Sequence, residues 1–179
     1  IDELKHFLPR YMELISDFQF PSHSTEVALR KFESLKKADC TEEEAAFLKE
    51  FSLVFFKKCL SVHPLPEGET IDSILIMFLH GKFDLSALFK SWIDTDSVPS
   101  TLHFIDLWFD GFYQTNTEKM TNPFGDKKLA IELRSWITQK DTRAAFSSRI
   151  EQLVMNDVEM DYFESIRLNM VYDMLNALK

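Results

Sequence analysis

Cysteine and glycine are both scarce in this chain, and each scarcity excludes a class of fold or site. Only two cysteines occur, Cys40 and Cys59, without a CxxC pair or the Cys/His spacing of a structural zinc site. We expect two reduced thiols rather than a disulfide, as in a cytoplasmic protein. Only four glycines are present in 179 residues, which disfavours glycine-rich phosphate loops and tight β-hairpins.

Long apolar runs and targeting signals are also missing. No run approaches the ~18 apolar residues that a membrane-spanning helix needs, so we expect no membrane partner. The first residues, Ile1 to Lys5, lack the basic-then-apolar pattern of a secretory signal. The chain does not begin with Met, which leaves open what precedes Ile1. These features together predict a cytoplasmic location.

Basic residues are outnumbered: 20 Lys and Arg stand against 29 Asp and Glu, for a net charge of −9. Such a surface repels nucleic acids on average and attracts basic partners. Nucleophilic catalysis also lacks its sequence signals, because the chain has no Gly-x-Ser-x-Gly motif and no Cys beside a His. The composition therefore predicts neither a nucleic-acid partner nor a cofactor.

What the chain does contain is apolar residues, including 17 Phe and three Trp, arranged at helical spacing between repeated N-cap signals. We predict an all-α fold. Residues 1–179 would form a single globular domain of about eight or nine helices, packed as antiparallel hairpins around two buried central helices.

The first of those central helices is predicted over residues 71–81. Six uninterrupted apolar residues, 74–79, leave no face for water, which is typical of a helix buried on all sides. Thr70 is the expected N-cap, and Gly81 the expected left-handed end. The second central helix is predicted over residues 98–112, with Pro99 in its first turn.

Other helix boundaries follow from capping residues and proline. Residues 41–44, Thr-Glu-Glu-Glu, form a capping box that begins a helix running to about residue 62. Residues 1–20 are expected to form one helix or two short ones, because Pro9 breaks a helix when it lies in the interior. Three further helices are expected to begin at Asn122, Asp141 and Asp157, and Phe163 to face the core from the last of them.

One polar group stands out on the second central helix. His103, Asp106 and Asp110 are spaced i, i+3, i+7 and share roughly one-fifth of the helix circumference. An imidazole and two carboxylates on one ridge suit a divalent metal, or a base with an orienting group. Alternatively, they are ordinary polar residues on the solvated strip of a buried helix. We favour this second interpretation and predict no metal. His63, near a loop, shows no metal-ligand spacing and is not part of the set.

Acidic residues gather between residues 70 and 112, where six acids accompany two bases. Asp84, Asp94 and Asp96, at helix caps and in loops, are the expected contacts for a basic protein partner. A solvated acidic rim without a partner is the alternative.

Two function classes remain open. The favoured one is a non-catalytic protein-binding module with an acidic surface, most concretely an immunity-type inhibitor of a basic toxin or nuclease. The alternative is an enzyme, or a ligand- or metal-binding helical protein, that uses a cleft beside His103, Asp106 and Asp110. The sequence indicates neither the oligomeric state nor the identity of the partner.

Overall fold

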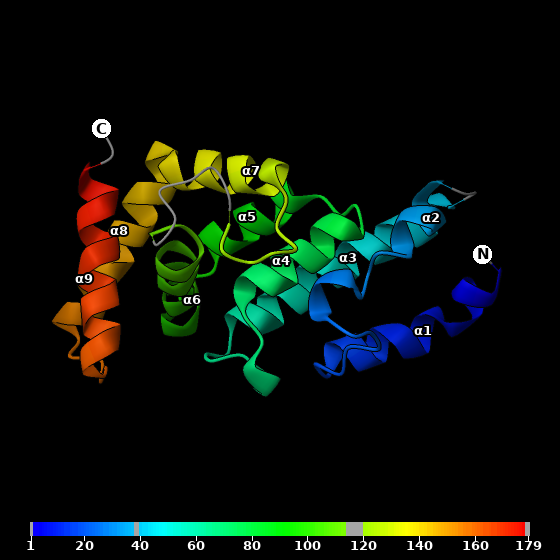
Figure 1. The fold of residues 1–179 in the computed structure, drawn as a ribbon, viewed down its shortest axis with the longest axis horizontal. Helices are drawn as coiled ribbons and strands as arrows, with labels where there is room; N and C mark the ends of the chain where they lie inside the picture. The colour runs from blue at the N-terminus through cyan, green and yellow to red at the C-terminus, as the bar shows by residue number, and fades with distance from the viewer. Residues whose placement is uncertain (1, 38–39, 114–119, 178–179) are drawn as a thin grey trace. The chain divides into compact units, whose positions relative to one another are not determined.

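A computed structural model describes residues 2–37, 40–113 and 120–177, and over these residues the chain is helical without a strand (Figure 1). The predicted all-α fold is confirmed. The described elements are α1 Asp2–Ser16, η1 Thr25–Val27, α2 Phe32–Lys37, α3 Glu42–Leu60, η2 Pro66–Gly68, α4 Ile71–His80, α5 Leu85–Asp94, α6 Val98–Trp108, η3 Phe109–Tyr113, α7 Lys127–Thr138, α8 Lys140–Met155 and α9 Tyr162–Ala177. Among the helices of this part of the chain, none is both long and apolar enough to span a membrane.

The chain divides into two compact units. Unit 1 consists of Ile1–Cys59 and Pro64–Leu88, and unit 2 of Leu60–His63 and Phe89–Lys179. The two predicted central helices, α4 and α6, lie in different units. A single domain, with antiparallel hairpins around both helices, therefore stays a prediction.

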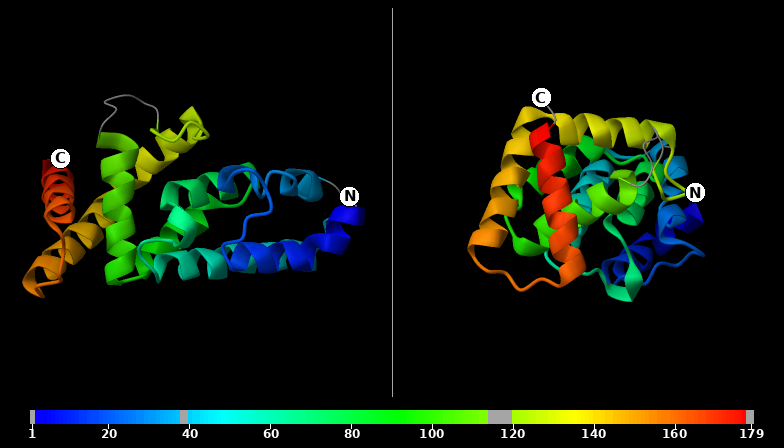
Figure 2. Two further views of the ribbon diagram at one scale, coloured as in Figure 1. Left: turned by 60° about the horizontal axis from the view of Figure 1, so that its bottom comes forward. Right: turned by 60° about the vertical axis from the view of Figure 1, so that its left-hand side comes forward.

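In unit 1, α1 and α3 lie side by side (Figure 2). The Lys5 ammonium lies 2.9 Å from the Glu44 carboxylate, and Lys58 Nζ donates to the Ser16 carbonyl oxygen at 2.5 Å. The predicted capping box begins α3, since the Glu44 amide donates to Thr41 Oγ1 and the Thr41 amide donates to Glu44 Oε2.

Helix α4 is buried on all sides, as its apolar run predicts. Seven of its ten residues, Ile71 and Ser73 to Phe78, are buried. Its end differs from the prediction, because Gly81 has a φ of −76° and the left-handed residue is Lys82, with a φ of 58°. Glycine is needed at position 81 for space instead: an added Cβ would lie 2.8 Å from the Phe83 ring and 2.9 Å from Leu29 Cβ.

Pro9 does not break the first helix. It lies inside α1, which continues to Ser16. The apolar face of the same helix supplies Met12 and Ile15 to the core. Burial of this face therefore outweighs the backbone hydrogen bond that proline cannot make.

Helices α7 and α8 begin at other residues than predicted. Helix α7 begins after Asp126, whose Oδ1 accepts from the Leu129 amide at 2.7 Å, while Asn122 accepts from the Phe124 amide in a turn. Asp141 lies in the first turn of α8 rather than at its N-cap.

The start of α9 is moved by the backbone at Asp157. The φ of Asp157 is 47°, a left-handed conformation that an N-cap residue does not adopt. Asp161 and Glu164 form a capping box instead, in which Asp161 Oδ1 accepts from the Glu164 amide at 2.8 Å and Glu164 Oε2 accepts from the Asp161 amide at 2.9 Å.

The core of unit 2 is an aromatic cluster that holds α6 in place. The rings of Phe104 and Phe146 stack at 3.7 Å, and both also contact Trp92 and Trp136. Trp92 Nε1 donates to the Ser100 carbonyl oxygen at 3.0 Å, so the buried indole is satisfied. This packing fixes the position and rotation of α6.

Replacing Phe78 with Ala should destabilise the protein by about 3–5 kcal/mol, because this fully buried ring of α4 would leave a cavity. Chemical denaturation gives the value. The matched control is Phe47→Ala in α3, where the side chain is 53% exposed and the loss should stay within ~0.5 kcal/mol. Equal losses in the two variants would contradict the burial of α4.

The two cysteines should differ in reactivity. Burial raises the pKa of the Cys59 thiol far above its usual range, whereas Cys40 is partly exposed. A disulfide reagent such as DTNB should label one thiol quickly in the native protein and the second only after denaturation. In Cys40→Ser the fast phase should vanish; a fast phase that survives would show that Cys59 is accessible.

Candidate functional site

Residues 60–63 leave the end of α3 and bind to α6 within unit 2. The Leu60 carbonyl oxygen accepts from Ser97 Oγ at 3.4 Å, and the Val62 carbonyl oxygen accepts from His103 Nε2 at 2.7 Å. Pro64 follows directly and prevents α3 from continuing. The segment therefore places His63 next to α6.

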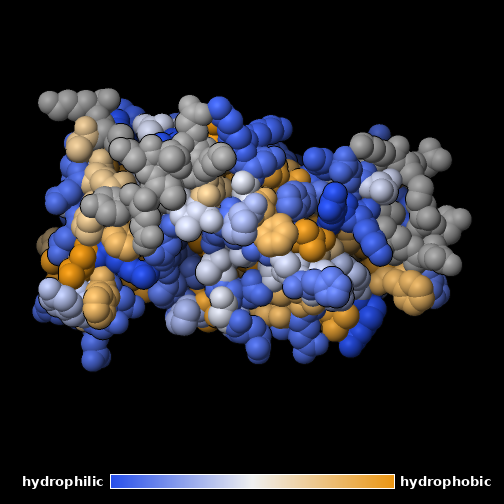
Figure 3. Space-filling view, in the orientation of Figure 1, coloured by the Kyte–Doolittle hydropathy of each residue, from blue (hydrophilic) through white to orange (hydrophobic). Residues whose placement is uncertain are grey.

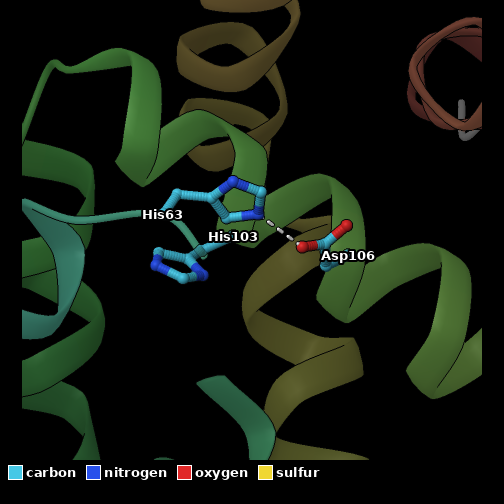
Figure 4. Close-up of side chains that lie close together, drawn as sticks. All are labelled: His63, His103 and Asp106. Carbon is cyan, nitrogen blue, oxygen red and sulfur yellow. Dashed lines mark hydrogen bonds and ion pairs between the residues drawn. The ribbon is translucent and has the colours of Figure 1, made fainter. Parts of the chain in front are cut away.

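His63, His103 and Asp106 come together at this position (Figure 4). His63 Nε2 lies 2.7 Å from Asp106 Oδ2, and the two imidazole rings meet edge to face with their centroids 4.8 Å apart. One ligand atom from each residue lies within 4.8 Å of those of the other two. Among the described residues, this is the one group of three or more His, Cys, Asp or Glu side chains whose ligand atoms lie close enough together to share a metal ion.

His103 is not on a solvated strip of α6, which corrects the interpretation favoured from the sequence. Its side chain is only 3% exposed. Because a carbonyl oxygen can only accept, Nε2 of His103 carries the hydrogen in its bond to Val62. In the neutral ring the lone pair then lies on Nδ1.

The spacing on the helix grouped Asp110 with His103. In the structure, Asp110 instead contacts Arg167 of α9. Arg167 Nη1 lies 3.1 Å from Asp110 Oδ2 and 3.3 Å from Asp106 Oδ1. The same guanidinium lies over the Phe109 ring, 5.2 Å from its centroid. The predicted trio is therefore split, with His103 and Asp106 in the cluster and Asp110 in an ion pair beside it.

The sequence offered no signal for His63 or Arg167. His63 is 43 positions from Asp106, and Arg167 is 61 positions from it. Neither separation along the sequence matches a local ligand motif, so only the tertiary structure brings these residues together.

The acids predicted to contact a partner are exposed, but the structure already engages two of them. Asp84, in unit 1, accepts from the amide and the hydroxyl of Ser86, and these bonds hold the pKa of its carboxyl below the usual range. Asp96 Oδ1, in unit 2, lies 3.3 Å from Arg149 Nε. That these acids bind a partner stays a prediction.

The acids at the end of α5 lie near the positive charge of Arg149. Its guanidinium is largely buried, donates to the carbonyl oxygens of Trp92 and Ile93, and lies over the Phe146 ring. Burial lowers the pKa of Arg149, and the charges of Asp96 and Asp94 oppose that shift. Both acids therefore serve as counter-charges inside unit 2.

Large apolar side chains are exposed around the turn between α8 and α9. Met155 is 81% exposed, Tyr162 74% and Phe163 72%, with Val154 beside them. This corrects the expectation that Phe163 faces the core. Figures 1 and 2 show α8 and α9 side by side with the turn at one end, and Figure 3 shows hydrophobic surface over the same end of this pair.

The same turn is strongly acidic. Residues 150–166 contain five acids and no Lys or Arg. The acids are Glu151, Asp157, Glu159, Asp161 and Glu164. We call these acids, together with Val154, Met155, Tyr162 and Phe163, the α8–α9 turn surface.

In comparisons with known proteins, no family model, curated protein or solved structure matches the chain.

Asp106→Asn should cost more stability than Asp110→Asn. Asp106 contacts both His63 and Arg167, whereas Asp110 contacts Arg167 and is half exposed. We expect a loss of about 1–2 kcal/mol for Asp106→Asn and under ~1 kcal/mol for Asp110→Asn, measured by urea denaturation. The reverse order would show that Asp106 does not join the two elements.

Proposed function

We propose that this protein is a non-catalytic protein-binding module that recognises a basic, amphipathic segment of a partner through the α8–α9 turn surface. The observation that carries the proposal is the exposure of Met155, Tyr162 and Phe163 within one acidic turn. An immunity-type inhibitor of a basic toxin or nuclease is the most concrete form of this function.

The apolar part of the surface supports an interface. Grouped, exposed apolar side chains on a soluble protein mark interaction sites more often than isolated ones do. Tyr and Phe supply large contact area at a small entropic cost, and Met adapts to the shape of a partner. The rings of Tyr162 and Phe163 contact each other edge to face, with centroids 5.7 Å apart, which restricts both before binding.

The charge of the surface selects the chemistry of the partner. Five acids without a basic residue surround the apolar group, so Lys and Arg flanking an apolar stripe are the complementary pattern. Nucleic acid is disfavoured by the same charge. Proteins that bind nucleic acid carry basic surfaces, which is why a nuclease is a suitable target for such a module.

A second candidate function is favoured by a separate observation, the cluster of His63, His103 and Asp106. It belongs to the metal-binding class rather than to protein recognition.

The test uses two designed helical peptides of equal length, one built from Leu and Lys and the other from Leu and Glu. The Lys peptide should bind, and the backbone amide signals that move in NMR spectra should be those of residues 150–166. Replacing Met155, Tyr162 and Phe163 together by Ser should weaken binding at least about tenfold, since truncated anchor residues cost about 2 kcal/mol or more. The matched control, Phe47→Ser with Val54→Ser, removes exposed apolar side chains from unit 1 and should leave binding unchanged.

Charge is tested in the same assay. Asp157→Lys with Glu159→Lys should slow association of the Lys peptide and flatten its salt dependence, whereas Glu50→Lys with Glu67→Lys in unit 1 should not. Equal binding of both peptides would contradict the proposal. So would equal effects of the two apolar variants or of the two charge variants.

A further inference from the structure

We propose that His63, His103 and Asp106 form a binding site for a divalent transition-metal ion of the zinc class. This site is distinct from the α8–α9 turn surface, so it goes beyond the proposed protein-binding function.

The distances between the ligand atoms are close to those that a metal ion requires. Zinc–ligand bonds of about 2.0–2.1 Å in a tetrahedron place neighbouring ligand atoms about 3.3 Å apart. His63 Nε2 and Asp106 Oδ2 are 2.7 Å apart, and no separation in the group exceeds 4.8 Å. Side-chain rotations that change these separations by ~0.6 Å to at most ~1.5 Å bring the three atoms to the spacing of ligands around one ion.

His103 is oriented as a metal ligand. A ligating histidine usually donates its other ring N–H to a carbonyl or carboxylate, which fixes the ring and its tautomer. His103 Nε2 donates to the Val62 carbonyl oxygen at 2.7 Å, and burial of the side chain restricts it further. Nδ1 is then the nitrogen that can coordinate, and the ring of His63 lies next to the ring of His103 (Figure 4).

The two carboxylate oxygens of Asp106 have different partners. Arg167 Nη1 holds Oδ1 at 3.3 Å, which leaves Oδ2 directed at His63. The positive charge of Arg167 would repel a cation, but Asp110 lies 3.1 Å from the same nitrogen. With neutral imidazoles, two carboxylates and one guanidinium leave a net charge of −1 around the site, which attracts a cation.

The donor set determines the class of metal. Two imidazole nitrogens and one carboxylate oxygen suit Zn²⁺, Co²⁺, Ni²⁺ or Fe²⁺, whereas Mg²⁺ and Ca²⁺ prefer oxygen alone. On binding, the ion takes the place of the hydrogen between His63 and Asp106, and the single ring proton of neutral His63 moves to its Nδ1. Three protein ligands leave a fourth position for water.

The experiment titrates the chelator-treated full chain with Zn²⁺ by isothermal calorimetry, with Mg²⁺ as the comparison. We expect one Zn²⁺ per chain with a Kd of about 10 μM or tighter, no heat with Mg²⁺, and a Zn²⁺-dependent rise in Tm.

The variants identify the ligands. His63→Ala, Asp106→Asn and His103→Gln should each weaken Zn²⁺ binding at least about tenfold. Gln at position 103 keeps a donor for Val62, so this variant tests coordination without emptying the core, and circular dichroism confirms that each variant is folded. The controls are His6→Ala and His23→Ala, which remove exposed histidines. Absence of Zn²⁺ binding to the wild-type chain would overturn the proposal, as would equal weakening in the exposed-histidine controls and the cluster variants.

Discussion

The carbonyl groups at the end of α3 impose the constraint on which the arrangement around α6 depends. The last carbonyls of any helix have no partner within it, and Pro64 prevents a further turn. Ser97 donates to Leu60, the last residue of α3, and His103 donates to Val62, two residues beyond it. Because α6 is held by the stacked rings of Phe104 and Phe146, these bonds place residues 60–63 at a defined position, and His63 meets Asp106.

Features whose cause is local could be predicted from the sequence. The capping box at Thr41 and the burial of α4 are both present, since each depends on neighbouring residues. Predictions failed where another local hydrogen bond competed. Asp126 rather than Asn122 caps α7, and the left-handed backbone of Asp157 moves the start of α9 to Asp161.

The candidate site could be predicted only in part, for a different physical reason. Helical spacing correctly placed His103 and Asp106 near each other, but it also grouped Asp110 with them and overlooked His63. Spacing on one helix cannot show that a segment 43 positions away approaches from outside, or that Arg167 of α9 holds Asp110. It also cannot show that Phe163, at an apolar helical position, is left uncovered.

The proposed metal site depends on the docking of residues 60–63 on α6. The most direct test is a crystal structure of the chain grown with Zn²⁺, with diffraction data collected on both sides of the zinc absorption edge. The account predicts one anomalous peak about 2.0–2.2 Å from His63 Nε2, His103 Nδ1 and an oxygen of Asp106, with Asp110 still paired to Arg167. An anomalous map without a peak at these three residues, with His63 still bonded to Asp106, would contradict it.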